Sequence, residues 1–273
     1  MLEIAGVCKT FNAGTPNELR ALQGVQLTVQ DGSFVVIIGT NGSGKSTLLN
    51  AVAGSFSADA GAIKVDGTDI TKWPECRRAR FIGRVFQNPF CGTAASMSIA
   101  ENLALAAHRG RRRGLGWLLQ RNLLSKMRAQ VRELNMGLED RLKSPIGSLS
   151  GGQRQALTLL MATWLRPQVM LLDEHTAALD PKSADQVIAL TDKIVKRDQL
   201  TTLMVTHSMQ QAASLGNRLI MMHRGQLIQD FQGAEKKRLR PDDLMRASKK
   251  CGGRTCWTRA QQRCCDECMS ETV

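Results

Sequence analysis

Lys45 and Ser46 close a glycine-rich stretch whose residue types and spacing suit the binding of a phosphate group. The stretch follows the pattern G-x-x-x-x-G-K-[ST], in which glycines let successive backbone N–H groups point at one anion. A helix that begins directly behind such a loop adds positive partial charge at the same place. Lys45 would reach the β- and γ-phosphates of a bound nucleotide, and the Ser46 hydroxyl would hold Mg²⁺. The residues predicted to contact the nucleotide here are Gly39, Thr40, Asn41, Gly42, Ser43, Gly44, Lys45, Ser46 and Thr47.

A second group of reactive side chains follows the ends of two apolar runs. Asp173 and Glu174 come directly after the run at 169–172, and His207 comes shortly after the run at 202–205. An aspartate in this place supports Mg²⁺ at the γ-phosphate, and a glutamate beside it polarises water as a general base. His207 is placed to orient that glutamate or to contact the γ-phosphate. We interpret the other histidines as structural: His108, His175 and His223.

The elements around these residues indicate an α/β fold. The apolar run at 34–38 predicts a buried parallel strand before the glycine-rich stretch, and the run at 48–53 predicts a helix after it. Strands and helices then alternate, which is typical of a parallel sheet covered by helices. Residues 2–8 and 21–29 alternate apolar and polar side chains and predict two antiparallel strands. The predicted fold class is therefore α/β: a P-loop NTPase core with a parallel sheet and an N-terminal antiparallel β subdomain.

A helical subdomain is predicted as an insertion in this core. Residues 98–142 have apolar side chains at helical spacing and form a separate lobe in our interpretation. Ser150-Gly151-Gly152 then precede a helix predicted at 154–165, which makes a second helix N-terminus able to bind an anion. We expect this second site to complete the γ-phosphate site only from across an interface.

Together these residues resemble one family closely: the nucleotide-binding subunits of ATP-binding-cassette (ABC) transporters, of the importer type. Leu149-Ser150-Gly151-Gly152-Gln153 matches the signature sequence of that family. The resemblance implies that Gln87 is the Q-loop glutamine, a catalytic residue and metal ligand, and that Asp180 is the D-loop aspartate at the nucleotide. It also implies that His207 is the switch histidine and that Phe11 stacks on adenine. For Phe11, an ordinary place in the core is an equally good interpretation.

The resemblance further implies a reaction and a set of partners. ATP, held with Mg²⁺, would be hydrolysed between two copies of the chain. Each site would use residues 39–47 of one copy and residues 150–152 of the other. Hydrolysis would drive a separate membrane permease at the cytoplasmic face of the cell membrane, supplied by an extracytoplasmic solute-binding protein. Residues 91–102 resemble an importer branch associated with tryptophan or other aromatic amino acids, so import of a small solute such as an amino acid is expected.

Charge and length leave one alternative function. The net charge of +13 favours polyanionic neighbours, so an ABC ATPase that acts on nucleic acid or the ribosome is the alternative. We regard nucleic acid as the less expected partner, because the chain has one cassette and no sustained heptads. The basic run at 109–113 either approaches anionic lipid or forms a solvated face. No apolar run reaches the roughly 20 residues of a membrane span and no secretory signal opens the sequence, so a peripheral subunit is expected.

The motifs divide the chain into an ABC ATPase domain at 2–240 and a C-terminal tail at 241–273. Within the domain, we predict that 1–90 and 155–240 form the nucleotide-binding core and that 91–154 form the helical signature subdomain. Five of the eight cysteines lie in residues 251–273, which have no helical period. We interpret 251–273 as non-native in character, the product of a shifted reading frame. A zinc site at Cys265 and Cys268 is the weaker alternative.

Overall fold

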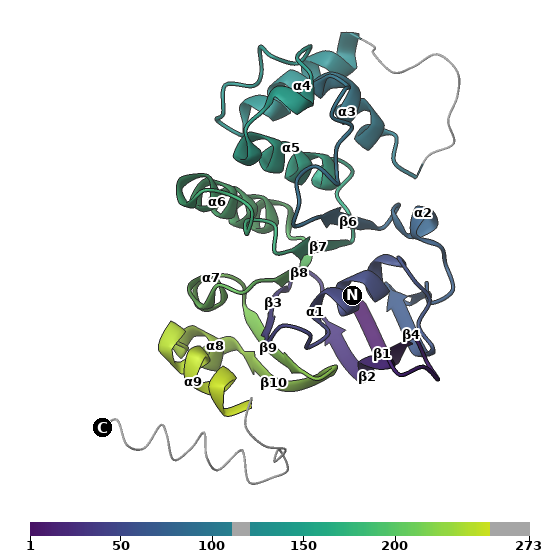
Figure 1. The fold of residues 1–273 in the computed structure, drawn as a ribbon. Coiled ribbons are helices and arrows are strands. Elements are labelled where there is room, and N and C mark those ends of the chain that lie inside the picture. The colour runs from purple at the N-terminus through teal and green to yellow at the C-terminus, as the bar shows by residue number, and fades with distance from the viewer. Residues whose placement is uncertain (111–120, 252–273) are drawn as a thin grey trace.

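Two β-sheets and a set of helices make up the part of the chain that the computed structural model describes, residues 1–110 and 121–251 (Figure 1). Within these residues, none of the helices combines the length and the apolar character that crossing a membrane requires. Most of the basic run at 109–113 and the cysteine-rich residues 252–273 lie outside the described ranges. Our predictions for those two segments therefore stay predictions.

The first sheet is antiparallel and comes from the start of the chain. Its strands are β1 (Leu2–Phe11), β2 (Leu19–Val29), β4 (Ala60–Val65) and β5 (Thr68–Asp69). They lie in the order β2-β1-β4-β5, and each neighbouring pair is antiparallel. Leu2 and Ile4 of β1 are buried on one face, as the alternation of apolar and polar residues predicts.

The second sheet is mostly parallel. Its strands are β3 (Phe34–Gly39), β6 (Ile82–Val85), β7 (Val169–Asp173), β8 (Thr201–Val205), β9 (Arg218–His223) and β10 (Gln226–Gln232). They lie in the order β10-β9-β3-β8-β7-β6, parallel from β9 to β6, with β10 antiparallel at the edge. The α/β fold class with parallel and antiparallel parts is confirmed. The carboxyl ends of β3, β7 and β8 lie side by side, which is where ligands bind in open α/β sheets.

The inner strands β3, β7, β8 and β9 of the second sheet are buried on both faces, which explains their apolar runs. Val35 and Ile37 of β3 face a cluster that also includes the first sheet, and Val36 and Ile38 face a cluster on the opposite side. We call these clusters the first core and the second core. Representative members of the first core are Leu2, Val35, Ile37, Leu48, Leu171 and Leu203. Representative members of the second core are Val36, Ile38, Leu159, Ile194, Met204 and Leu244.

Helices cover the two faces separately. Helix α1 (Lys45–Ala53) packs into the first core, whereas α6 (Pro181–Asp198) and α7 (Met209–Ser214) pack into the second. Helix α1 ends at Gly54, which has a φ of +84° that favours glycine, as the sequence predicts. The remaining short helices of this part are α2 (Glu75–Arg78) and α8 (Gly233–Arg238).

The predicted helical lobe has a core of its own. It contains α3 (Ile99–Ala107), α4 (Arg121–Arg132), the 3₁₀ turn η1 (Ile146–Ser148) and the first part of α5 (Gly151–Thr163). Its buried side chains include Leu103, Met127, Leu138 and Leu157. Helix α5 also supplies Leu159 and Ala162 to the second core, so it belongs to the lobe and to the sheet at once. The limit that we predicted between residues 154 and 155 therefore falls inside one continuous helix.

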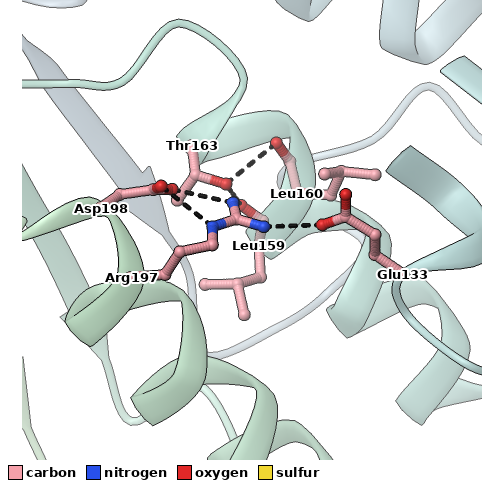
Figure 2. A network of polar contacts seen from close by, with 6 residues as sticks. All are labelled: Glu133, Leu159, Leu160, Thr163, Arg197 and Asp198. Carbon is pink, nitrogen blue, oxygen red and sulfur yellow. Dashed lines mark hydrogen bonds and ion pairs between the residues drawn. The ribbon is translucent and has the colours of Figure 1, made fainter. Parts of the chain in front are cut away.

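A polar contact joins the lobe to α6 (Figure 2). Arg197, near the end of α6, places Nη1 2.6 Å from Oε2 of Glu133, which follows α4. The same guanidinium donates from Nε and Nη2 to the carboxylate of Asp198, at 2.9 Å each. Glu133 and Arg197 are about half exposed, and exposed ion pairs stabilise a fold by only about 0–1 kcal/mol. The pair therefore contributes little to the stability of the contact between the lobe and α6.

The segment predicted as a tail begins with an ordered helix. Residues Pro241–Cys251 form α9, and Leu244 is buried in the second core beside α7. Our predicted tail started at residue 241 because the family resemblance runs only to about residue 240. The buried leucine shows that the packed part of the chain continues into α9.

Candidate active site

The glycine-rich stretch forms the loop between β3 and α1, and close backbone approaches explain its glycines. A Cβ atom on Gly39 would come within 2.2 Å of the backbone oxygen of Met222, on the neighbouring strand β9. A Cβ atom on Gly44, whose φ is +97°, would come within 2.5 Å of the backbone oxygen of Ala21. A side chain at Gly39 would push the loop away from the second sheet, and one at Gly44 would push it away from the first. The local strand-loop-helix order is thus held in place by long-range packing.

Lys45 is buried inside this loop. Its ammonium donates to the backbone oxygens of Gly39 at 2.9 Å and Thr40 at 3.0 Å, and 5% of the residue is exposed. Burial lowers the pKa of Lys45, and the nearby carboxylates of Glu174 and Asp173 partly oppose that shift. A cation held this way is already desolvated and surrounded by the groups that the sequence predicts for phosphate chemistry.

Ser46 and Asp173 meet as the sequence pattern requires for a metal site. The Ser46 hydroxyl donates to Oδ1 of Asp173 at 3.0 Å, although the two residues are far apart in the chain. Hydroxyl and carboxylate oxygens are the ligand types that Mg²⁺ prefers. The described residues contain no group of three or more His, Cys, Asp or Glu that could hold a metal ion. The donor set therefore fits a magnesium ion that also binds a nucleotide.

Glu174 and His207 form a close pair beside that site. Nε2 of His207 lies 2.5 Å from Oε1 of Glu174, and their side chains are 46% and 12% exposed. Glu174 has a φ of +46°, and its backbone N–H donates to the oxygen of Val205 on the adjacent strand β8 at 3.0 Å. An uncommon backbone conformation at a reactive carboxylate is a recurring feature of functional sites. Of the two roles open to His207, the geometry places it against the glutamate.

The predicted second anion site lies at the start of α5, in the helical lobe. Ser150 caps α5 by accepting from the backbone N–H of Gln153 at 3.3 Å, and the Gln153 side chain accepts from the Ser150 N–H in return. Gly152 packs against α6, because a Cβ atom there would come within 2.7 Å of Ser183. The first part of α5 belongs to the lobe, which lies beyond β6, and β8 and β7 separate β6 from β3, so residues 150–153 lie apart from the 39–47 loop of the same chain (Figure 1).

Asp180 lies next to that second site rather than at the glycine-rich loop. It caps α6 by accepting from the backbone N–H of Ser183 at 3.0 Å. Hydrogen bonds from Ser183 keep the pKa of Asp180 below its ordinary value. Leu179 lies close to Gly151, because a Cβ atom on Gly151 would come within 3.2 Å of the Leu179 side chain. The structure thus brings the predicted signature and D-loop residues together.

Phe11 and Gln87, two further predicted site residues, lie at or just beyond the ends of strands. Phe11 ends β1 and packs edge-to-face on Phe56, with the ring centroids 5.3 Å apart and an interplanar angle of 82°. Gln87 is exposed two residues beyond the end of β6. Gln155 of α5, which is fully buried, donates to the backbone oxygen of Phe86 at 3.0 Å and so holds the segment that carries Gln87. We did not single out Gln155 in the sequence, because a glutamine inside a helix has no distinguishing pattern.

Arg84 is a second residue that the sequence patterns did not reveal. It lies on β6 with Nη2 4.0 Å from Oδ2 of Asp173, and the same nitrogen donates to the Asn50 side chain. Burial lowers the pKa of Arg84, while Asp173 and Glu75 oppose the shift. The arginine therefore places a cation on the oxygen of Asp173 that does not contact Ser46. Only the pairing of β6 with β7 brings these residues together.

Comparison with known proteins gives consistent matches. The family described as "ABC transporter" matches residues 22–177. The chain is 42% identical over 247 residues to a tyrosine transport ATP-binding protein of Clostridioides difficile, covering 90% of this chain and 97% of that protein. It is 32% identical over 232 residues to an energy-coupling factor transporter ATP-binding protein, EcfA2, of Clostridium acetobutylicum, covering 83% and 78%.

Solved structures give the same picture. A dimeric post-hydrolysis structure of the ATP-binding cassette MJ0796 with ADP and Pi has a TM-score of 0.73 at 26% identity, covering 85% of this chain and 98% of that one. The ADP form of the cassette MJ1267 has a TM-score of 0.74 at 26% identity, covering 92% and 98%. The resemblance that the motifs indicate is confirmed, and these relatives give no support to the nucleic-acid alternative.

Proposed function

The chain belongs to the ABC transporter family, and we propose that it is the ATP-hydrolysing subunit that powers the import of an aromatic amino acid, with tyrosine as the first candidate. Binding and hydrolysis of ATP follow from the family itself. The solute, the metal, the residue roles and the partners are our proposals. The residue roles and the metal rest on the pairing of Glu174 with His207 beside the Ser46–Asp173 contact, and the solute and partners rest on the similarity to a tyrosine transport ATP-binding protein.

Hydrolysis at this site uses side chains of three adjacent strand ends. Lys45, already desolvated within its loop, neutralises charge on the β- and γ-phosphates. Glu174 accepts a proton from the attacking water, and His207 holds that carboxylate in one orientation. Ser46 and Asp173 would hold Mg²⁺, with Gln87 as a further ligand, and the ion supplies charge neutralisation at the phosphates when bound.

We further propose that two copies of the chain enclose the nucleotide. The helix N-terminus at Ser150, Gly151 and Gly152 is suited to an anion, but it lies in the lobe beyond β6, apart from the loop at 39–47 of its own chain. A head-to-tail dimer would bring this helix N-terminus to the γ-phosphate held by the other copy. The similarity to a dimeric cassette supports this arrangement. In it, Asp180 and Gln153 would lie near the shared nucleotide and Phe11 would stack on adenine.

The proposed place of action is the cytoplasmic face of the cell membrane. A separate permease would carry the solute, and an extracytoplasmic solute-binding protein would deliver it. Support for an aromatic amino acid comes from the relative in C. difficile, whose description names tyrosine and which matches over nearly its whole length. Nothing in an ATP-hydrolysing subunit has to touch the solute, so the test must use the assembled transporter.

Glu174→Gln tests the proposed base. The amide keeps the size of the side chain but accepts no proton, so we expect the rate of ATP hydrolysis to fall by at least roughly 10²-fold. We also expect the variant with ATP to migrate as a dimer of the 29.9 kDa chain in size-exclusion chromatography with light scattering. Glu235→Gln, which changes an exposed carboxylate on α8, is the matched control. Hydrolysis by Glu174→Gln at the control rate would refute the assignment.

The solute is tested in the host cell. Loss of the gene should abolish the uptake of radiolabelled tyrosine, and the wild-type gene should restore it. The Glu174→Gln gene should not restore uptake, because the subunit would bind the permease without completing the cycle. Unchanged tyrosine uptake in the deletion strain would refute the proposed solute while leaving ATP hydrolysis intact.

A further inference from the structure

We propose that Gln211 is a positioning residue for the Glu174–His207 pair, an inference that rests on the function proposed above. Gln211 lies in α7, and its side-chain amide joins two loops. Its Oε1 accepts a hydrogen bond from Oγ1 of Thr206 at 2.8 Å, and its Nε2 donates to Oγ1 of Thr176 at 3.3 Å. One amide group thus connects the residue just before His207 with the loop just after Glu174.

The two loops need such a connection because the sheet ends before them. The parallel pairing of β7 with β8 reaches its last register pair at Asp173 and Val205. One more backbone bond follows, from the N–H of Glu174 to the oxygen of Val205. Beyond that point the chain turns with Glu174 at a φ of +46°, a conformation that persists only where the surroundings determine it. The bonds of Gln211 lie directly beyond that turn.

The chemistry of an amide suits this place. Thr206 and Thr176 are 4% and 8% exposed, so both hydrogen bonds are shielded from water. An amide offers an acceptor and a donor on one rigid plane, so it can bind one hydroxyl that donates and another that accepts at the same time. An apolar side chain of the same length would fill the space and bind neither hydroxyl.

Gln211 is itself held firmly. Its backbone N–H donates to Oγ of Ser208, which caps α7, at 3.3 Å. The Ser208 N–H in turn donates to Oγ1 of Thr206 at 3.1 Å. Main chain and side chain of Gln211 therefore share one network with the start of α7. Movement of the amide would require movement of the helix that comes after His207.

The loop after Glu174 is anchored on its other side as well. His175 is buried, with Nε2 3.0 Å from Oγ1 of Thr191 on α6. The segment carrying Glu174 is thus tied to α6 by one side chain and to α7 by Gln211. Of these two anchors, Gln211 is the one that also holds the His207 loop, so it links the positions of Glu174 and His207.

Gln211→Met is the principal test. A misplacement of about 1 Å at a reacting group costs up to about 10²-fold in rate, so we expect kcat for ATP hydrolysis to fall roughly 10- to 100-fold. The Kd for a fluorescent ATP analogue should change by less than about threefold, because the loop at 39–47 is untouched. Gln210→Met, the same change at an exposed neighbour in α7, should keep the wild-type kcat. Equal kcat for the two variants would overturn the proposal.

Further variants separate positioning from folding. Gln211→Glu keeps an oxygen toward each threonine hydroxyl, both of which can rotate to donate, so it should recover most of the lost kcat. Thr176→Val removes only the hydrogen bond from Nε2 of Gln211 and should also lower kcat. It replaces Gln211→Met as the test if that variant does not fold. Full activity of Thr176→Val would contradict the proposal.

A double-mutant cycle with His207→Ala isolates the coupling. If Gln211 acts through the Glu174–His207 pair, Gln211→Met should cost much less in the His207→Ala background than in the wild type. Losses that multiply would show that Gln211 acts by another route.

The Glu174→Gln result distinguishes a failure of the positioning role from a failure of the proposed function. If Glu174→Gln loses ATP hydrolysis and Gln211→Met keeps the wild-type kcat, only the positioning role is refuted. Normal hydrolysis by Glu174→Gln refutes the proposed base.

Discussion

His175 directly follows the proposed catalytic base and is nevertheless enclosed by protein. It is 1% exposed, and its described polar contact is the one with Thr191. Burial lowers the pKa of His175 from its ordinary value of 6.5 to about 4, because the surroundings do not solvate an imidazolium. The sequence predicts a structural role for this histidine, and the geometry agrees with that role. Its neutral form is part of the folded state.

This residue should make the stability of the fold depend on pH. Between about pH 6.5 and pH 4 the unfolded chain binds a proton at His175 and the folded chain does not, so the free energy of unfolding falls as the pH falls. At 1.36 kcal/mol per pKa unit, the loss between pH 7 and pH 5 is roughly 2 kcal/mol. His175→Gln should lack this part of the loss, measured by urea unfolding at both pH values. An identical loss in wild type and variant would contradict the prediction.

At the scale of elements, the helix behind the phosphate loop depends on a buried arginine from α2. Arg78 is 1% exposed and donates from Nη1 to the backbone oxygens of Ala51 at 2.7 Å and Val52 at 2.9 Å, in the last turn of α1. It also donates to the oxygens of Trp73 and Thr71. A cation at the C-terminus of a helix satisfies free carbonyls and complements the helix dipole.

Arg78→Met should therefore destabilise the fold. The change leaves buried carbonyl oxygens without a donor, and we expect the free energy of unfolding to fall by about 3 kcal/mol. Arg77→Met is the matched control, because Arg77 is exposed and stacks over Trp73 with 3.7 Å from its guanidinium carbon to the ring centroid. That contact is worth about 1 kcal/mol or less. Urea unfolding measures both, and equal losses would contradict the assigned role of Arg78.

At the scale of the whole molecule, the C-terminal segment has two parts with different consequences. Helix α9 buries Leu244 in the second core beside α7, whereas residues 252–273 lie outside the described structure. The cysteine-rich sequence of the latter part has no pattern that predicts packing. Stability should therefore depend on α9, and catalysis should not depend on the residues C-terminal to it.

Two truncations check this. A chain ending at Lys250 should hydrolyse ATP at the wild-type rate and unfold at the same temperature. A chain ending at Arg240 loses the burial of Leu244 and should be less stable by roughly 1.5–3 kcal/mol, measured by thermal and urea unfolding. Loss of nucleotide turnover in the longer chain would refute the prediction that residues 251–273 are dispensable.

What the sequence alone determined about this protein is local in origin. The strand, the glycine-rich loop and the helix from 34 to 53 are contiguous, so their periodicity and turn residues predict them without knowledge of the rest. The same holds for Asp173 and Glu174 after a buried strand and for Ser150 at the start of α5. These short patterns suffice to indicate the family.

Which of these local pieces meet depends on the tertiary structure. Glu174 contacts His207 because β7 and β8 are neighbours, and Arg84 reaches Asp173 because β6 pairs with β7. Gln211 had no recognisable pattern, since its role depends on two hydroxyls from other loops. The separation of residues 150–153 from the phosphate loop likewise depends on the place of the lobe beyond β6, with β8 and β7 between β6 and β3. Strand order and helix placement follow from the packing of the whole chain, and no local run of residues encodes them.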